Sequence, residues 1–386
     1  MMSKRAVRKI CLCMVLLLCM SGCWDSSDIE DISFAIGFGI DSVDDEQAPI
    51  QLTTQVASTK KQGGQAATAQ QGKLFQNLTL KGNSMHDILR SLALQLPYPV
   101  FTDHLETIVI NKDTATDYDL FILLDQMLRD NVTRSSPAVL LTKQTARDVL
   151  AVNIEGEITS AYINNFFENE SSTMKILPQK RVGEVTANLI SGTSVVLPNI
   201  TKEKNTVRLD GAGVIRANDN KLAGFLTDKE VEGINWLTGN GNGGLLNFKD
   251  EQGNTIIYEI QHYKTKTKPY YKNGKLSFDV QITAQGWITE DWSLTSNNLS
   301  ENYIAKLESL AGDEVVKIIE GTMEKLQQDY KADVVEFYNS FRIAYPRDYQ
   351  KMKKDWDHYF ADANVEYDVE LKIVNTGDLV KEGKPK

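Results

Sequence analysis

The sequence predicts an α+β protein of several mixed α/β domains, with antiparallel-rich sheets and helices packed on one face. Three observations predict this class. The first half alternates between segments with the periodicity of strands and segments with that of helices. The second half contains two long alternating segments joined by an Asn-Gly turn signal, and long helical patterns follow them. The 386 residues are sufficient for two or three domains.

The first 22 residues have the pattern of a secretory signal peptide. Lys4, Arg5, Arg8 and Lys9 precede an apolar stretch of eleven residues, 10–20. A membrane-spanning helix needs about 20 apolar residues, so this stretch is too short for one. An uncleaved anchor and a buried first helix are the alternatives that we considered, and the flanking charges and the small-residue ending favour the signal peptide.

The end of this segment, Ser21-Gly22-Cys23, resembles the lipobox of bacterial lipoproteins, with Met20 in place of the usual leucine. The resemblance implies cleavage between Gly22 and Cys23, and S-diacylglycerol and N-acyl (palmitate-type) lipidation of Cys23. Residues 23–31 would then be a lipidated linker. All four cysteines lie in the first 23 residues, so no disulfide or cysteine metal site is expected downstream.

The charge of the chain limits its partners. Removal of the four positive charges in the signal takes the formal net charge from −10 to −14. An acidic protein is repelled by nucleic acid and by an anionic membrane surface, so we expect no nucleic-acid partner. Membrane attachment would come from the covalent acyl chains.

The N-terminal α/β region is expected at residues 32–200, and a division into two subdomains near 140–155 is left open. Its first strand, 32–40, carries Gly37 and Gly39 on one face, which leaves room for a closely packed helix. Further strands are expected at 50–56, 74–80, 105–110 and 138–141, and helices at 85–96, 118–128, 145–152, 161–167 and 182–190.

A C-terminal α+β domain of antiparallel sheet and long helices is expected at residues 205–380, after a polar boundary near 198–207. A hairpin is predicted across 217–220, and a second across 272–275 with a type I′ turn at Asn273-Gly274. Helical patterns cover 316–330 and 334–341, and a last strand covers 365–373.

A search for catalytic and ligand-binding motifs gives nothing specific. The nucleophile elbow, zinc-protease, phosphate-loop and dinucleotide motifs are missing, and the four histidines are scattered. We therefore predict no catalytic residue, no metal and no cofactor. The acidic residues Asp41, Asp44, Asp45 and Glu46 are interpreted as a solvated turn, because they lack the pattern of a Ca²⁺ loop.

Lys264, Lys266 and Lys268 alternate with threonines, which places three ammonium groups on one side of a strand. The favoured interpretation is an edge strand that uses lysine to prevent sheet-to-sheet pairing. The alternative is a docking edge for an acidic partner.

Several segments in order resemble one known family. They begin with Cys23-Trp24-Asp25 and GFGID (37–41), continue with DHLETIVI (103–110) and LRDNVTRSSPAVLLT (128–142), and end with the strand that leads to NTG (375–377). Between them lie segments 209–239, 271–290 and 333–346. This set resembles the Ger(x)C family, the lipoprotein C subunits of spore nutrient germinant receptors. The loop at 62–72 departs from the pattern in length.

The resemblance implies a function that composition cannot supply. Family members lie on the outer face of the spore inner membrane and assemble with two integral membrane subunits. The complex responds to amino acids, sugars or nucleosides, and the C subunit has no known enzymatic activity. The expectation is a non-enzymatic, lipid-anchored receptor subunit needed for nutrient-triggered germination.

Two other hypotheses are kept open. A solute-binding lipoprotein that delivers a small ligand to a membrane transporter would need a deep cleft lined by aromatic residues between two lobes. A surface hydrolase would need paired carboxylates or a metal. Glu290 and Asp291 are adjacent, but neighbours on a strand point to opposite faces.

Overall fold

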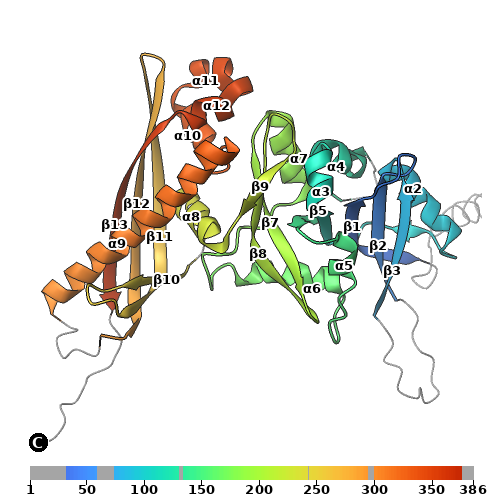
Figure 1. The fold of residues 1–386 in the computed structure, drawn as a ribbon, viewed down its shortest axis with the longest axis horizontal. Helices are drawn as coiled ribbons and strands as arrows, with labels where there is room; N and C mark the ends of the chain where they lie inside the picture. Colours follow the sequence, from blue (N-terminus) through green and yellow to red (C-terminus); the bar gives the residue numbers. More distant parts are fainter. Residues whose placement is uncertain (1–31, 59–73, 130–133, 242, 294–299, 376–386) are drawn as a thin grey trace, which may run out of the picture.

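The computed structural model is an elongated molecule built on two β-sheets (Figure 1), and it describes residues 32–58, 74–129, 134–241, 243–293 and 300–375. The larger sheet belongs to the N-terminal part and the smaller to the C-terminal part, with one helix, α8 (Asp228–Thr238), between them. The signal segment, the cleavage site, Cys23, the linker to residue 31 and the loop at 62–72 lie outside the described residues.

The larger sheet is mixed. Its strands follow the order β3-β2-β1-β5-β6-β7-β8-β9, and β4 pairs with β1. The central pairs β1–β5, β5–β6 and β6–β7 are parallel, and the outer pairs are antiparallel. The strand bounds are β1 (Ser33–Ser42), β2 (Ile50–Ala57), β3 (Phe75–Gly82), β4 (Val100–Phe101), β5 (Thr107–Asn111), β6 (Ala138–Thr142), β7 (Val195–Glu203), β8 (Thr206–Ile215) and β9 (Leu222–Leu226).

Helices cover both faces of this sheet, where the sequence predicted one. Ile108 and Ile110 belong to one buried cluster and Val109 to another, so β5 is buried on both sides. Parallel strands need crossover connections, and those connections place helices on the faces. One face carries α2 (Met85–Ser91), α3 (Lys112–Asp117), α4 (Leu120–Arg129) and α7 (Val182–Ser191), and the other carries α5 (Ala146–Leu150) and α6 (Thr159–Asn165). Short 3₁₀ turns follow α2 and α6 at η2 (Leu92–Leu94) and η3 (Phe166–Asn169).

The glycines of β1 are confirmed as the place where helices pack closely. A Cβ added at Gly37 would lie 1.7 Å from the Ser160 hydroxyl oxygen on α6. At Gly39 it would lie 3.2 Å from Ala146 on α5. Both helices can approach β1 this closely because Gly37 and Gly39 have no side chain.

Asp41 corrects the prediction of a solvated acidic turn. Its side chain is only 3% exposed, and its two carboxylate oxygens accept hydrogen bonds from the backbone N–H groups of Ala146 (2.7 Å) and Arg147 (3.0 Å). The first N–H groups of a helix have no acceptor within the helix itself, and a negative charge near them is stabilising. Asp41 supplies both the acceptor oxygens and the charge at the start of α5. Burial raises the pKa of Asp41, and the two N–H donors oppose that increase. Asp44 remains exposed, as predicted.

The polar stretch at 198–207, expected as a domain boundary, forms the paired ends of β7 and β8. Hydrogen-bonded neighbours run from Val195 opposite Ile215 to Glu203 opposite Thr206, with an irregularity after Pro198. The hairpin turns at Lys204, whose φ is 48°. The larger sheet therefore continues through this stretch, and the domain limits stay a prediction.

The smaller sheet has the order β10-β11-β12-β13. Its strands are β10 (Gly244–Lys249), β11 (Thr255–Lys272), β12 (Lys275–Asp291) and β13 (Asn364–Asn375). The type I′ turn is confirmed by positive φ at both Asn273 (54°) and Gly274 (77°). The last strand departs from an all-antiparallel arrangement, because β13 pairs parallel to β12.

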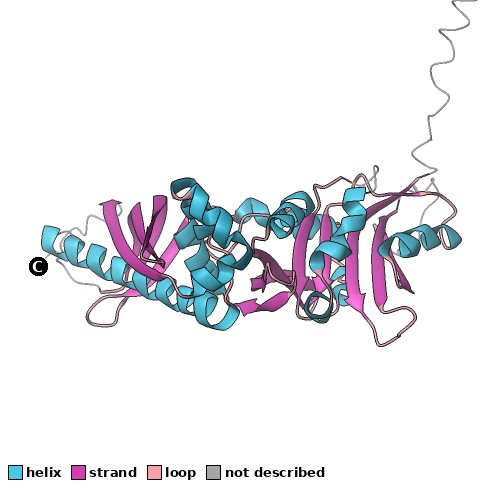
Figure 2. Ribbon diagram, turned by 90° about the horizontal axis from the view of Figure 1, so that it is seen from above, coloured by secondary structure: helices cyan, strands magenta, loops and turns pink. Residues whose placement is uncertain are grey.

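A helical crossover joins β12 to β13 and makes the parallel pairing possible. It comprises α9 (Glu301–Glu324), the π-helical turn η4 (Lys325–Tyr330), α10 (Phe337–Ala344), α11 (Pro346–Met352), η5 (Lys353–Asp355) and α12 (Trp356–Ala361). The long helix α9 lies along one face of the four strands (Figures 1 and 2). This sheet has the one-sided helix packing that the sequence predicted.

The helix α8 begins and ends with strong local signals. Thr227 and Glu230 form a reciprocal capping box at its start, and Gly239 ends it in the left-handed conformation. Its side chains from Val231 to Leu237 are buried. A Cβ added at Gly233 would lie 2.0 Å from the Thr322 hydroxyl oxygen, so α8 and α9 meet at a distance that only glycine allows.

Asp41→Ala should lower the free energy of unfolding by roughly 1–3 kcal/mol, because it leaves two buried N–H groups of α5 without an acceptor. Asp44→Ala, in the same acidic run but exposed, is the matched control and should change it by less than about 0.5 kcal/mol. Urea denaturation followed by circular dichroism measures both. Equal effects of the two substitutions would contradict the capping role of Asp41.

Candidate functional site

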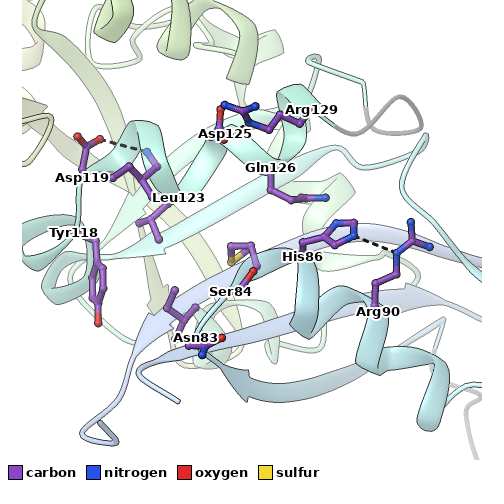
Figure 3. A pocket seen from close by; sticks show the side chains of 13 residues that line it. Asn83, Ser84, His86, Arg90, Tyr118, Asp119, Leu123, Asp125, Gln126 and Arg129 are labelled. Carbon is purple, nitrogen blue, oxygen red and sulfur yellow. Dashed lines mark hydrogen bonds and ion pairs between the residues drawn. The ribbon is translucent and has the colours of Figure 1, made fainter. Parts of the chain in front are cut away.

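A groove with a volume of about 860 Å³ lies between α2 and α4. Figure 3 shows His86 and Arg90 on one helix opposite Asp125, Gln126 and Arg129 on the other. The buried side chains of Met85 and Leu123 line its apolar part. Both helices pack on the same core cluster of the larger sheet, and that shared core fixes their separation.

Charges in the groove are paired within each helix. Arg129 and Asp125 form an ion pair of 2.5 Å at i,i+4 spacing, and Arg90 Nε lies 3.4 Å from His86 Nε2. Asp119 accepts hydrogen bonds from the N–H of Phe121 (2.8 Å) and from the side-chain amide of Asn220 (3.1 Å). Several polar groups of the groove thus already have partners within the chain. It could accommodate a small polar molecule, but it brings no nucleophile and base together.

This groove is not the cleft that a solute-binding lipoprotein was expected to have. Tyr118 is the single aromatic residue among the described residues that line it. It lies between two helices on one sheet and not between two lobes. In the sequence, His86 is one of four scattered histidines. A usable signal was the i,i+4 spacing of His86 with Arg90 and of Asp125 with Arg129 on two amphipathic helices.

Asp333 is the most deeply buried carboxyl group with a perturbed pKa. Its oxygens accept hydrogen bonds from the indole N–H of Trp356 (2.8 Å) and the backbone N–H of Tyr338 (2.7 Å), Val335 (3.1 Å) and Phe337 (3.2 Å). Desolvation outweighs these donors and raises the pKa of Asp333 to about 7, and the nearby charge of Asp357 adds to the increase. The arrangement holds the loop before α10 in place.

Asp357 connects the C-terminal helices to the larger sheet. One oxygen accepts from the Asp333 N–H (2.9 Å) and the other from the Ser194 hydroxyl (2.7 Å), just before β7. The Ser194 oxygen in turn accepts from the Ala217 N–H (2.9 Å). Burial raises the pKa of Asp357. The buried Asp333 and the partly buried Asp357 therefore both hold elements of the chain together.

Glu290 and Asp291, weighed as a hydrolase pair, serve separate local contacts. Glu290 accepts from the indole N–H of Trp292 (2.9 Å). Asp291 accepts from the hydroxyl of Tyr303 (3.0 Å) and the N–H of Ser293 (2.8 Å). Across the described ranges, no group of three or more His, Cys, Asp or Glu residues is arranged to hold a metal ion.

Lys264, Lys266 and Lys268 lie exposed on β11. The pairing of β11 with β10 ends at Ile260, so the three lysines occupy the part of the strand beyond β10. On that side, Thr265 donates to the carbonyl of Trp236 at the end of α8 (2.6 Å). This position fits both edge protection and docking, and the docking role stays a prediction.

The mixed two-sheet fold has a solved relative. The crystal structure of the GerBC protein is similar with a TM-score of 0.62 and 29% sequence identity, covering 90% of this chain and 100% of that chain. Residues 25–202 match the family model described as spore germination protein N-terminal domain. Residues 210–377 match the model described as spore germination B3/GerAC like, C-terminal. These matches define a spore germination protein.

Two relatives in Bacillus subtilis (strain 168) extend the likeness over the whole chain. Spore germination protein YndF is 32% identical, covering 97% of this chain and 98% of the relative. Spore germination protein B3 is 31% identical, covering 95% and 97%. The chain belongs to the GerAC/B3 family of spore germination proteins, which confirms the family resemblance and the mixed α/β fold class.

The raised pKa of Asp333 predicts a pH dependence. The folded state binds this proton more tightly than the unfolded state, whose Asp titrates near 4, so the free energy of unfolding should fall as pH rises from about 4 to about 7. Asp333→Asn removes the titration, and its stability should decline less over the same interval. Urea denaturation at several pH values measures both slopes, and identical slopes would contradict the assignment.

Proposed function

We propose that this protein is a non-enzymatic, lipid-anchored subunit of a nutrient germinant receptor, needed for nutrient-triggered spore germination. The observation that carries the proposal is the near full-length similarity to spore germination proteins, together with the Ser21-Gly22-Cys23 ending of the N-terminal segment. Its partners would be two integral membrane subunits of the same complex. Its place would be the outer face of the spore inner membrane.

The anchoring step rests on the sequence. Among the described residues, no helix combines the length and apolar composition needed to cross a membrane. Two acyl chains on Cys23 would be sufficient for stable attachment, at about 0.8 kcal/mol for each buried CH₂ group. The formal charge of −14 after removal of residues 1–22 gives no electrostatic attraction to anionic lipid.

A structural and not a catalytic role is supported by the contacts of three acidic side chains. Asp41 caps α5, Asp333 fixes the loop before α10, and Asp357 joins the C-terminal helices to the larger sheet. Each of these carboxylates accepts at least two hydrogen bonds from donors of the chain itself. Such groups hold surfaces in position, which is what a receptor subunit needs.

Cys23→Ala should release the folded protein from membranes and impair nutrient germination, because the acyl chains would have no attachment site. Membrane fractionation and germination assays on spores measure the two effects. Cys19→Ala, inside the segment expected to be removed, is the matched control and should change neither. Normal germination of Cys23→Ala spores with normal protein abundance would contradict the anchoring role.

A further inference from the structure

The face of the smaller sheet opposite α9 is open. Phe278, Val280 and Ile282 of β12 point into the core, so the residues between them point to the other face. In the described part of the chain, α9 to α12 and α8 contribute to the core on the inner face. Figure 2 shows α9 along that side only of the four strands. The open face is therefore a surface available to a partner.

Charge is segregated across this open face. The strand register aligns three rows that each run from a lysine on β11 to an acid on β13: Lys264–Thr283–Glu370, Lys266–Gln281–Asp368 and Lys268–Asp279–Glu366. We call the first column the lysine stripe (Lys264, Lys266, Lys268) and the last column the acidic stripe (Glu366, Asp368, Glu370). All six side chains are exposed. Because neighbouring strands are about 4.8 Å apart, the stripes are about 10 Å apart.

The lysine stripe has few partners within its own chain. Within the described ranges, Lys264 and Lys266 form no ion pair, and the Lys268 ammonium lies 4.9 Å from the ring centre of Tyr270. In the acidic stripe, Asp368 accepts from the Gln281 amide (3.1 Å) and Glu370 pairs with Lys372 (3.3 Å). The lysine stripe can therefore take an acidic partner without breaking an existing ion pair.

The other end of the same face carries three exposed apolar side chains, with Glu259 between two of them. Leu245 on β10 is 50% exposed, Trp287 on β12 is 40% exposed and Val374 on β13 is 58% exposed. In the strand register, Leu245 lies opposite Glu259 and Glu259 lies opposite Trp287. Val374 directly precedes the residue of β13 that lies opposite Trp287. A row of exposed apolar side chains across a sheet is typical of an interaction surface, and Trp is enriched at the centres of interfaces.

We propose that this face binds a second copy of the chain, face to face, about a two-fold axis parallel to the strands. Such a rotation exchanges the two edges of the sheet and keeps the strand direction. The rotation places the lysine stripe of each copy over the acidic stripe of the other, so the dimer has two equivalent charge contacts. Because positions along the strands are kept, the exposed apolar side chains of the two copies also face each other. An axis across the strands would instead oppose lysine with lysine, so the charges select one arrangement.

The remainder of the molecule is compatible with this arrangement. Figure 1 shows the strands of the smaller sheet running across the long axis of the molecule. A rotation about a strand-parallel axis therefore sends the N-terminal parts of the two copies in opposite directions. Packed sheets lie about 10 Å apart with nearly aligned strands, as this axis requires.

The size of the face sets the expected strength. Three strands about 12 residues long present roughly 600 Å² on each copy, from the usual strand spacing and rise. Stable interfaces bury about 800 Å² on each partner, so this dimer should be reversible on dilution. Its charge contacts should weaken with added salt.

Charge reversal tests the proposal with the full-length protein purified in detergent. Sedimentation velocity over a range of concentrations should show a monomer–dimer equilibrium. Reversal of the lysine stripe (Lys264→Glu, Lys266→Glu, Lys268→Glu) should give monomers, and so should reversal of the acidic stripe (Glu366→Lys, Asp368→Lys, Glu370→Lys). A mixture of the two variants should form dimers again, because each then carries the complement of the other.

A matched control reverses three lysines on helices of the C-terminal part, Lys317, Lys353 and Lys354, all exposed. This variant has the same net charge as the lysine-stripe variant and should keep the dimer. Circular dichroism checks that every variant is folded. A wild-type monomer at all concentrations, or dimers that survive reversal of a stripe, would overturn the proposal. Failure of the mixture to dimerise would overturn the two-fold arrangement.

Discussion

The architecture depends on the burial of α8 between the two sheets. A buried helix end must have its polar groups satisfied, and here both parts of the chain supply partners. The Asn235 amide donates to the carbonyls of Met174 and Ile176, both at 2.8 Å, in the N-terminal part. The hydroxyls of Tyr263 (3.0 Å) and Thr265 (2.6 Å), on β11, donate to the carbonyls of Asn235 and Trp236. The same buried cluster includes Val214 of β8 and Tyr258 of β11, so the two sheets share one core.

This constraint determines which surfaces remain for partners. With α8 and α9 packed on the inner face of the smaller sheet, its outer face is left to solvent. The lysine stripe lies on β11 of that face and the acidic stripe on β13. Asp333 and Asp357 hold elements together, as the contacts from Asp357 to Ser194 and to the Asp333 N–H illustrate. The surfaces that remain are the ones available to the partners that the proposed function requires.

Local sequence signals predicted much of the fold and little of the site. The alternation in β1 and β12 and the Asn273-Gly274 turn were predictable, because each depends on neighbours in sequence. Close packing at Gly37 was predictable from the glycines on one face of β1, although the identity of its distant neighbour Ser160 was not. The parallel pairing of β13 was not, since it depends on how a long helical crossover returns. Asp41 was misinterpreted because its partners lie 105 and 106 residues away. The α2–α4 groove likewise forms only when two distant helices pack on the same core. The acidic stripe could not be paired with the lysine stripe from the sequence, because their alignment depends on the register of β11, β12 and β13.

The proposed function makes this protein a subunit of a membrane complex. Affinity purification of the tagged protein from detergent-solubilised spore membranes, followed by mass spectrometry, tests that role. Two multi-spanning membrane proteins should copurify with the tagged protein in constant ratio. Recovery of the protein from those membranes without any multi-spanning partner would contradict the proposed function.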